Sequence, residues 1–361
     1  MAPLTSSKLF QPLKVGNMEL KHRVIMAPLT RFRATDAHVP ILPMVKEYYT
    51  QRACVPGTLL ITEATFISPQ ASGYANVPGL FEPAQLKAWK EITDAVHEKG
   101  SFIYCQLWAL GRAATKAEMD KKGLDVVGAS AVPISEKSAM PRELREEEIR
   151  QFIRDYADAA KAAVEVGGFD GVEIHGANGY LIDQFTQDVS NHRTDSWGGS
   201  VENRARFALE VARAVTEAVG SNRVGIRLSP FSTFQSMKMA DPIPQLTYLT
   251  NGLSAIGLSY LHLVESRPGC TWKSDAPIFL AGGFSAQLAK EAADEYPGEE
   301  KGRDVGIVFG RFFISTPNLV WRLQKGLEFN EYNRGTFYKA QSEEGYTDYP
   351  FHERFLAESK L

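Results

Sequence analysis

The stretch VEIHGANGY, residues 172–180, places His175, Asn178 and Tyr180 directly after an apolar run. An imidazole, a carboxamide and a phenol can all form hydrogen bonds, and the imidazole and the phenol can also transfer protons. A histidine that closes an apolar run is, however, about as often a satisfied core residue as a catalyst. The elements around this stretch must therefore decide between the two interpretations.

Other polar side chains that follow apolar runs suit a flat heterocycle better than a sugar. Gln106 carries an amide that both donates and accepts, which matches the edge of a pyrimidine ring. Arg227 could neutralise negative charge on a reduced ring, and Thr30 could hydrogen-bond a ring carbonyl. Taken singly, each is more simply a strand-end group that satisfies local backbone.

Two glycine-containing stretches near the carboxyl end indicate a phosphate site. AGGF holds Gly282 and Gly283, and FGRF holds Gly310 beside Arg311. Glycine lets backbone approach a ligand closely, and a guanidinium matches phosphate oxygens. A single Gly-Arg pair would more often be a turn. Two such stretches, at the last two strand ends of a barrel, predict a phosphorylated ligand.

Short apolar, β-branched runs recur along the chain, and each is typical of a buried strand rather than an alternating edge strand. These runs are RVIMAP (23–28), TLLIT (58–62), SFIYCQL (101–107), GVEIH (171–175), RVGIRL (223–228), YLHLV (260–264), PIFLAG (277–282) and VGIVFG (305–310). The functional candidates above lie at the carboxyl ends of these runs.

Helical patterns separate most of the runs. An apolar stripe over 86–96 ends before Gly100, and Ser200 can cap a helix that finishes at Gly220. Pro317 is expected at the first position of a further helix. Eight strands alternating with helices predict an α/β fold of the (β/α)8 TIM-barrel type rather than a doubly wound sheet. We expect one domain over residues 1–361.

Two segments fall outside the strand and helix alternation. The initial stretch KLFQPLKVGNMELKH predicts a hairpin that turns at Gly16 and Asn17 and caps the lower mouth of the barrel. Residues 113–145 predict an extra excursion after the third strand, in the form of a small β-lid. Active sites of such barrels form at the carboxyl ends of the strands, so the polar candidates should converge there.

Taken together, the motifs strongly resemble those of the Old Yellow Enzyme family of FMN-dependent ene-reductases, in particular fungal members of its yeast and plant branch. The resemblance rests on HGANGYLIDQF followed by NHRTDSWGGSVENRARF, with APLTR, LLITEATFIS, QLWALGR, IRLSP and GRFFISTPNLV. It runs in unbroken order from Leu9 to about Pro350.

The resemblance implies a TIM barrel that holds FMN noncovalently, accepts hydride from NADPH or NADH, and reduces the C=C bond of an enone or similar activated alkene. It assigns flavin-ring contacts to Pro28, Leu29, Thr30, Ala64, Gln106 and Arg227, and the ribityl and phosphate end to Gly282, Gly283, Gly310 and Arg311. It assigns the substrate's carbonyl oxygen to His175 and Asn178 and the proton donor role to Tyr180. It places the aromatic residues Trp108, Phe337 and Tyr338 around flavin and substrate.

These assignments match the needs of alkene reduction. Hydride addition at the β-carbon drives negative charge onto the carbonyl oxygen, so two donors aimed at that oxygen stabilise the transition state more than the ground state. The α-carbon then needs a proton, which a phenol with an ordinary pKa near 10 can deliver.

Composition excludes several other classes. The chain has 361 residues, a formal net charge of −3 and no run of lysine or arginine, so we expect no nucleic-acid partner. No apolar stretch approaches the roughly 18 residues of a membrane span, and no signal peptide is recognisable. Cys54, Cys105 and Cys270 show no paired spacing, and neither CxxC nor HExxH occurs, so we expect no disulfide framework and no metal. The expected partner is a small-molecule substrate. The protein is expected to be a monomer or a homodimer.

Three alternatives stay open at this point. A phosphosugar isomerase or aldolase would need a strand-end base, for which Glu63 and Glu265 are the candidates. A flavin-binding protein without turnover would not need His175, Asn178 and Tyr180 together. A dedicated enone or oxylipin reductase or isomerase of secondary metabolism is the third. The final Ser359, Lys360 and Leu361 match a peroxisomal import address, so we expect a peroxisomal enzyme in a eukaryote and a cytoplasmic one otherwise.

Overall fold

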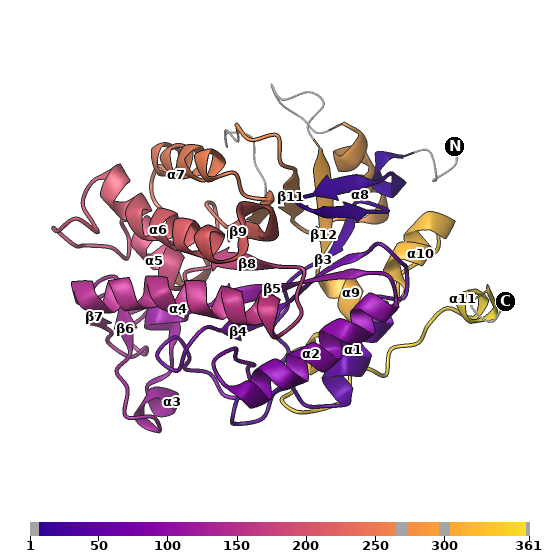
Figure 1. Cartoon of the computed structure of the whole chain (residues 1–361), viewed down its shortest axis with the longest axis horizontal. Coiled ribbons are helices and arrows are strands. Elements are labelled where there is room, and N and C mark those ends of the chain that lie inside the picture. Colours follow the sequence, from indigo (N-terminus) through magenta and orange to yellow (C-terminus); the bar gives the residue numbers. More distant parts are fainter. Residues whose placement is uncertain (1–6, 265–272, 296–303, 359–361) are drawn as a thin grey trace.

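Eight parallel strands close into a barrel, as the sequence predicts (Figure 1). The computed structural model describes residues 7–264, 273–295 and 304–358. Neighbouring strands follow one another in chain order, and the last pairs with the first. The barrel strands are β3 (Val24–Met26), β4 (Leu59–Phe66), β5 (Phe102–Trp108), β8 (Gly171–Gly176), β9 (Val224–Leu228), β10 (Tyr260–Val264), β11 (Ile278–Ala281) and β12 (Val305–Phe309). Every residue of β4 and β8 is buried, which explains why these runs show no alternation.

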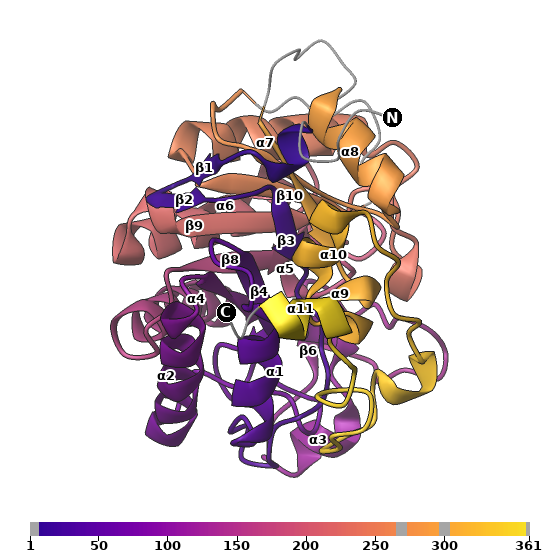
Figure 2. The same cartoon turned by 90° about the vertical axis from the view of Figure 1, so that its right-hand side faces the viewer.

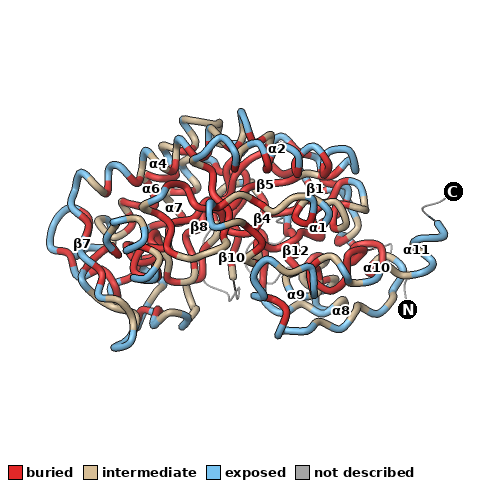
Figure 3. The backbone as a smooth tube through the Cα atoms, turned by 90° about the horizontal axis from the view of Figure 1, so that it is seen from below, coloured by how far each residue is buried: buried red, intermediate tan, exposed pale blue. Residues whose placement is uncertain are grey.

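Helices surround the barrel and carry both buried and exposed residues (Figure 3). The buried apolar residues of the helices share one core with those of the strands. The helices are α1 (Met44–Arg52), α2 (Pro83–Glu98), α4 (Glu146–Glu165), α5 (Leu181–Thr186), α6 (Val201–Val219), α7 (Ile243–Ile256), α8 (Ala286–Asp294), α9 (Arg311–Ser315) and α10 (Leu319–Lys325). Helix α2 buries Trp89, Ile92 and Val96, which confirms the predicted stripe. The Ser200 hydroxyl caps α6 by accepting the Asn203 backbone N–H at 3.2 Å.

The predicted start of the helix after β12 is wrong. Helix α10 begins at Leu319 with Asn318 as its cap, so Pro317 precedes the helix instead of opening it. The Thr316 hydroxyl accepts the backbone N–H of Asn330 at 3.0 Å. It therefore bonds to a later segment of the chain and does not cap the helix. A long-range contact therefore overrides the local signal.

The predicted hairpin is present and closes the lower end of the barrel. Strands β1 (Leu13–Val15) and β2 (Met18–Leu20) pair in antiparallel register across Gly16 and Asn17. Gly16 has a φ of +53°, and a Cβ there would lie 1.8 Å from the Asn222 carbonyl oxygen, so glycine is required. The apolar side of the hairpin packs on residues inside the barrel, among them Tyr104 and Tyr260.

The predicted excursion after β5 is also present, and its β-structure is limited to two strands of two residues each. It consists of α3 (Lys116–Asp120) and two short parallel strands, β6 (Val127–Gly128) and β7 (Arg142–Glu143). Arg142 joins its two ends, with nitrogen-to-oxygen distances of 2.9 Å to Asp125 and 2.9 Å to Glu148. The segment is thus held at its base by this two-stranded sheet and by the ion pairs of Arg142.

The chain after α10 passes the carboxyl ends of the strands, where Phe337 and Tyr338 lie, and leads to α11 (Glu353–Glu358), which lies on the outside of the molecule (Figures 1 and 2). Within the described ranges, none of the helices combines the length and apolar character needed to span a bilayer. Cys54 and Cys105 are free thiols. Glu265, Cys270, Ser359, Lys360 and Leu361, which entered the expectations above, lie outside the described residues.

Candidate active site

The site residues predicted from the sequence come together in two adjoining hollows at the carboxyl ends of the strands. The larger has a volume of about 780 Å³, and the smaller has a volume of about 240 Å³. The larger is lined by Pro28, Leu29, Thr30, Ala64, Gln106, Trp108, His175, Asn178, Tyr180, Arg227, Arg311, Phe337 and Tyr338, among others. The smaller is lined by Gly282, Gly283 and Gly310, and shares Pro28, Leu29, Arg227 and Arg311 with the larger. The sequence thus places ring, substrate and phosphate candidates in one continuous region.

His175 is a neutral hydrogen-bond donor. It stands beside Arg227 in the register of β8 and β9, and its Nδ1 accepts the backbone N–H of Ala177 at 3.3 Å. Burial, followed by the charges of Arg227 and His262, holds the pKa of His175 well below its usual value. A neutral imidazole whose Nδ1 accepts must carry its proton on Nε2. That N–H is therefore the group available to a ligand.

Both backbone groups of Asn178, its N–H and its carbonyl, are held by hydrogen bonds with other segments. Its backbone φ is +59°, a left-handed value that asparagine tolerates better than most residues. The Asn178 N–H donates to Ser229 Oγ at 2.6 Å, and its carbonyl accepts from Gln235 Nε2 at 2.9 Å. Gly179 follows with a φ of +74°, and its N–H donates to Asp183 Oδ2 at 2.8 Å. The chain therefore turns sharply between His175 and Tyr180.

Tyr180 immediately precedes α5 and packs its ring against two of the other candidates. The ring lies edge-on to Trp108 at 4.7 Å and to His175 at 5.0 Å between centroids. Burial raises the pKa of Tyr180 well above 10, nearby Tyr74 adds to this, and a hydrogen bond from Gln235 opposes it. The phenol therefore keeps its proton near neutral pH and can act as an acid.

Beneath the larger hollow, a buried cluster orients Gln106. Gln106 Nε2 donates to Glu173 Oε1 at 2.7 Å, while Glu173 Oε2 accepts from the Tyr260 hydroxyl at 3.0 Å and contacts His262 Nδ1 at 2.8 Å. Burial raises the pKa of Glu173, but His262, Arg227 and these hydrogen bonds outweigh it and hold the pKa below its usual value. Glu173 is thus an anion that turns the Gln106 nitrogen toward itself and leaves the amide oxygen for a ligand.

The residues present fit a flavin phosphate. Arg227 Nε is buried and has no hydrogen-bond partner among the residues that the structure describes, so a polar ring edge could satisfy it. Gly283 has a φ of +66°, and a Cβ on it would meet nothing within 4 Å, so the hollow opens beside it. Arg311 lies at the rim, where its Nη1 donates to the Tyr332 hydroxyl at 3.0 Å. Across the described ranges, no group of three His, Cys, Asp or Glu side chains is arranged to bind a metal.

Several lining residues escaped the sequence analysis, namely Phe32, Tyr74, Phe234, Ile314 and Arg334. Phe32 directly follows the APLTR motif and contacts Tyr338 at 5.8 Å and Tyr74 at 6.4 Å between ring centroids. Phe32 could have been found from its place beside that motif. Tyr74 lies in a loop and Phe234 in a single 3-10 turn, and neither has a periodicity that marks an inward-facing side chain.

Two buried arginines hold Phe337 and Tyr338 at the mouth. Arg31 Nε and Arg33 Nη1 both donate to the Phe337 carbonyl, at 3.0 and 3.1 Å. Glu63 accepts the Arg31 backbone N–H at 3.3 Å, and burial raises the pKa of Glu63 to about 7. This carboxyl therefore serves the arginine cluster and does not line either hollow, which removes the described candidate for an isomerase or aldolase base.

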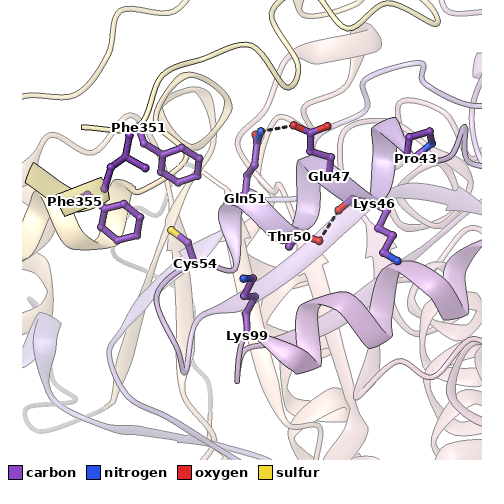
Figure 4. A pocket seen from close by; sticks show the side chains of 10 residues that line it. Pro43, Lys46, Glu47, Thr50, Gln51, Cys54, Lys99, Phe351 and Phe355 are labelled. Atoms are coloured by element: carbon purple, nitrogen blue, oxygen red, sulfur yellow. Dashed lines mark hydrogen bonds between the residues drawn. The ribbon is translucent and has the colours of Figure 1, made fainter. Parts of the chain in front are cut away.

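A separate pocket of about 580 Å³ lies between α1 and α11, away from the predicted residues (Figure 4). Some of its polar groups bond to one another: Gln51 donates to Glu47 at 3.0 Å, and the Thr50 hydroxyl donates to the Lys46 carbonyl at 2.7 Å. Burial raises the pKa of Cys54 to about 12, so this thiol is not a nucleophile near neutral pH. The side chains suited to catalysis, His175, Asn178 and Tyr180, lie instead at the barrel mouth.

Comparison with known proteins agrees with this geometry. Residues 8–330 match the NADH:flavin oxidoreductase / NADH oxidase family. The chain is 54% identical over 365 residues to a chanoclavine-I aldehyde reductase of Penicillium roqueforti, covering 97% of this chain and 98% of the relative. It is 48% identical to a probable inactive reductase of Epichloe festucae var. lolii, covering 99% and 98%. The crystal structure of Old Yellow Enzyme from a Pichia species superposes with a TM-score of 0.92 at 40% identity, covering 97% and 95%.

Proposed function

The chain belongs to the Old Yellow Enzyme family of NAD(P)H and flavin oxidoreductases, and on that premise we propose that it is an FMN-dependent reductase dedicated to one biosynthetic route. Its substrate would be an α,β-unsaturated aldehyde or ketone, and the product the saturated carbonyl compound. The observation that carries this proposal is the convergence of His175, Asn178 and Tyr180 above the floor formed by Gln106 and Arg227.

Each of these side chains has a defined task in the proposed reaction. FMN held noncovalently between the ring and phosphate contacts would carry hydride from NADPH or NADH to the β-carbon of the substrate. His175 Nε2–H and the Asn178 amide would bind the carbonyl oxygen and stabilise the charge that develops on it. Tyr180 would then give its proton to the α-carbon, completing net addition of hydride and proton across the C=C bond.

The dedicated role is supported by the relatives and by the mouth of the site. One relative is named for a particular aldehyde, which favours a specific carbonyl substrate over general enone reduction. Phe32, Tyr74, Trp108 and Tyr338 line the mouth with aromatic rings, which suits a flat, largely apolar substrate.

A flavin-binding protein without turnover is the second candidate, because a relative carries the name of a probable inactive reductase. This chain has His175, Asn178 and Tyr180 in one pocket, and simple storage of a cofactor would need none of them.

Product analysis separates these candidates. The purified protein is incubated with FMN, NADPH and either cinnamaldehyde or cyclohex-2-enone, and the products are identified by gas chromatography and mass spectrometry. We expect the saturated aldehyde and ketone. Cinnamyl alcohol would instead show reduction of the carbonyl group. The absence of any NADPH-dependent product would support the second candidate, a flavin-binding protein without turnover.

Peroxisomal location remains a separate proposal, based on Ser359, Lys360 and Leu361. A fluorescent protein that carries only the last ten residues of the sequence should enter peroxisomes of a host that imports such signals. Cytosolic fluorescence in that host would refute the proposal.

A further inference from the structure

The segment 234–238, between β9 and α7, combines backbone strain with contact to the active-site loop. Gln235, Ser236 and Lys238 have φ values of +57°, +56° and +105°. Left-handed backbone is unfavourable for these residue types and persists where the surroundings enforce it, often at functional sites. The proposed reaction uses none of these residues.

Gln235 connects this segment to the loop that carries Asn178 and Tyr180. Its Nε2 donates to the Asn178 carbonyl at 2.9 Å, and its own carbonyl accepts from Arg112 Nη2 at 3.1 Å. A Cβ on Gly179 would lie 2.9 Å from Gln235 Cβ and 2.8 Å from Met237 Cγ, so the two segments are in close contact. Arg112 thus holds Gln235, and Gln235 holds Asn178.

The Gln235 side chain also reaches the proton donor. A hydrogen bond from Gln235 lowers the pKa of Tyr180, against the larger effect of burial, which raises it. Gln235 Oε1 is buried and has no hydrogen-bond partner among the described residues. A buried acceptor of this kind needs a donor, and a hydroxyl group of a bound ligand would supply one.

We propose that Gln235 is a positioning residue for proton delivery, whose amide fixes the Asn178 carbonyl and, with it, the loop that carries the Tyr180 phenol. This inference rests on the proposed function. When Tyr180 gives its proton to the substrate's α-carbon, the bonding pair stays on the phenol oxygen, and the Gln235 N–H stabilises that phenolate until solvent returns a proton. Gln235 contacts the loop at Asn178 and Gly179 and acts on Tyr180 through that loop.

The test uses the holoenzyme of Gln235→Met, which keeps the length and the backbone strain but removes the amide. We expect anaerobic reduction of the flavin by NADPH to stay within about twofold of wild type, while reoxidation by cinnamaldehyde slows roughly 10- to 100-fold. The solvent deuterium isotope effect on reoxidation should rise, because proton delivery becomes limiting. Ser236→Ala is the matched control, since it loses a hydrogen bond from the same segment, to the Ile134 carbonyl, and should leave both steps unchanged.

Two further variants separate positioning from folding. Gln235→Gly removes the amide but accepts the left-handed backbone without strain, so reoxidation should be as slow as in Gln235→Met. Gln235→Glu places a carboxylate beside the phenol and should shift the pH profile of reoxidation upward. A normal reoxidation rate in Gln235→Gly, or equal losses in both half-reactions of Gln235→Met, would overturn the role of Gln235. Wild-type protein that binds no FMN, or is not reoxidised, would instead overturn the proposed function.

Discussion

At the scale of single residues, the site depends on keeping two groups uncharged in a buried setting. Burial lowers the pKa of His175 and raises the pKa of Tyr180, so both side chains are neutral near pH 7. Burial lowers the pKa of the neighbouring Arg227 and the Glu173 carboxylate opposes this effect, so the guanidinium remains the cation of the site. A neutral imidazole and a protonated phenol next to a fixed cation can stabilise negative charge on a substrate and then quench it with a proton.

Removal of the Tyr180 hydroxyl is the residue-level prediction. In Tyr180→Phe we expect flavin reduction by NADPH to be nearly unchanged and reoxidation by an enone to be slower by roughly 10²–10⁴-fold, because only the second step consumes the proton. Anaerobic stopped-flow measurement of each half-reaction checks this. Tyr74→Phe removes a neighbouring phenol that lines the same pocket and should change reoxidation far less. Equal losses in both half-reactions would remove Tyr180 from the proton-donor role.

The chemistry of single residues was more predictable than their environment. Long motifs identify His175, Asn178 and Tyr180, since a motif retains residue type and spacing. They give no information on the tautomer of His175, which depends on the Ala177 N–H, or on Gln235, which lies 57 positions from Asn178 in the chain. Contacts of that kind exist only once the barrel has closed.

At the scale of elements, the short helix α5 sets the direction of the loop before it. Asp183 on α5 accepts the Gly179 N–H at 2.8 Å and the Gln187 side-chain amide at 2.8 Å. Burial nevertheless raises the pKa of Asp183 from 3.8 to about 6. The loop is therefore anchored to a carboxyl group that titrates within a biologically relevant range.

This titration predicts a pH-dependent stability. Between pH 4 and pH 6 the folded state retains a proton on Asp183 that the unfolded state releases, so the contribution of this group to stability falls as the pH rises, and is constant above about pH 6. Relative to Asp183→Asn, which cannot titrate, wild type should lose about 3 kcal/mol of unfolding free energy across that window. Urea unfolding of both proteins from pH 4 to pH 8 measures the difference. A difference that does not change with pH would contradict the assignment.

The segment that carries Phe337 and Tyr338 gives a second prediction at this scale. Arg33 donates to the carbonyls of Phe337, Ser342, Thr336 and Glu344 at 2.9 to 3.2 Å. Arg33→Met leaves several of these acceptors unsatisfied and should lower the unfolding free energy by about 3–5 kcal/mol. Chemical denaturation measures this loss. The exposed Arg334, in the same segment, is the control, and Arg334→Met should change stability by no more than about 0.5 kcal/mol. Similar losses in both variants would show that the buried arginine does not clamp the segment.

At the scale of the whole molecule, the barrel was predictable because its signal is local and repeated. Each strand is a short run buried on both faces, and the run from 171 to 175 differs from β8 by a single residue at one end. The start of α10 and the small extent of the sheet in the excursion were not predictable, since the Thr316 hydroxyl accepts from Asn330 and Arg142 joins Asp125 to Glu148. The barrel order then brings the ends of eight separate strands to one mouth.

The central claim is that this mouth binds FMN and passes hydride from a nicotinamide to an unsaturated carbonyl compound. The most direct test is a visible absorption spectrum of the purified protein with FMN, recorded first under anaerobic NADPH and then after addition of an enone such as cyclohex-2-enone. We predict a yellow protein that bleaches with NADPH and regains its colour with the enone. A colourless protein that FMN cannot reconstitute, or a bleached flavin that the enone leaves reduced, would contradict the claim.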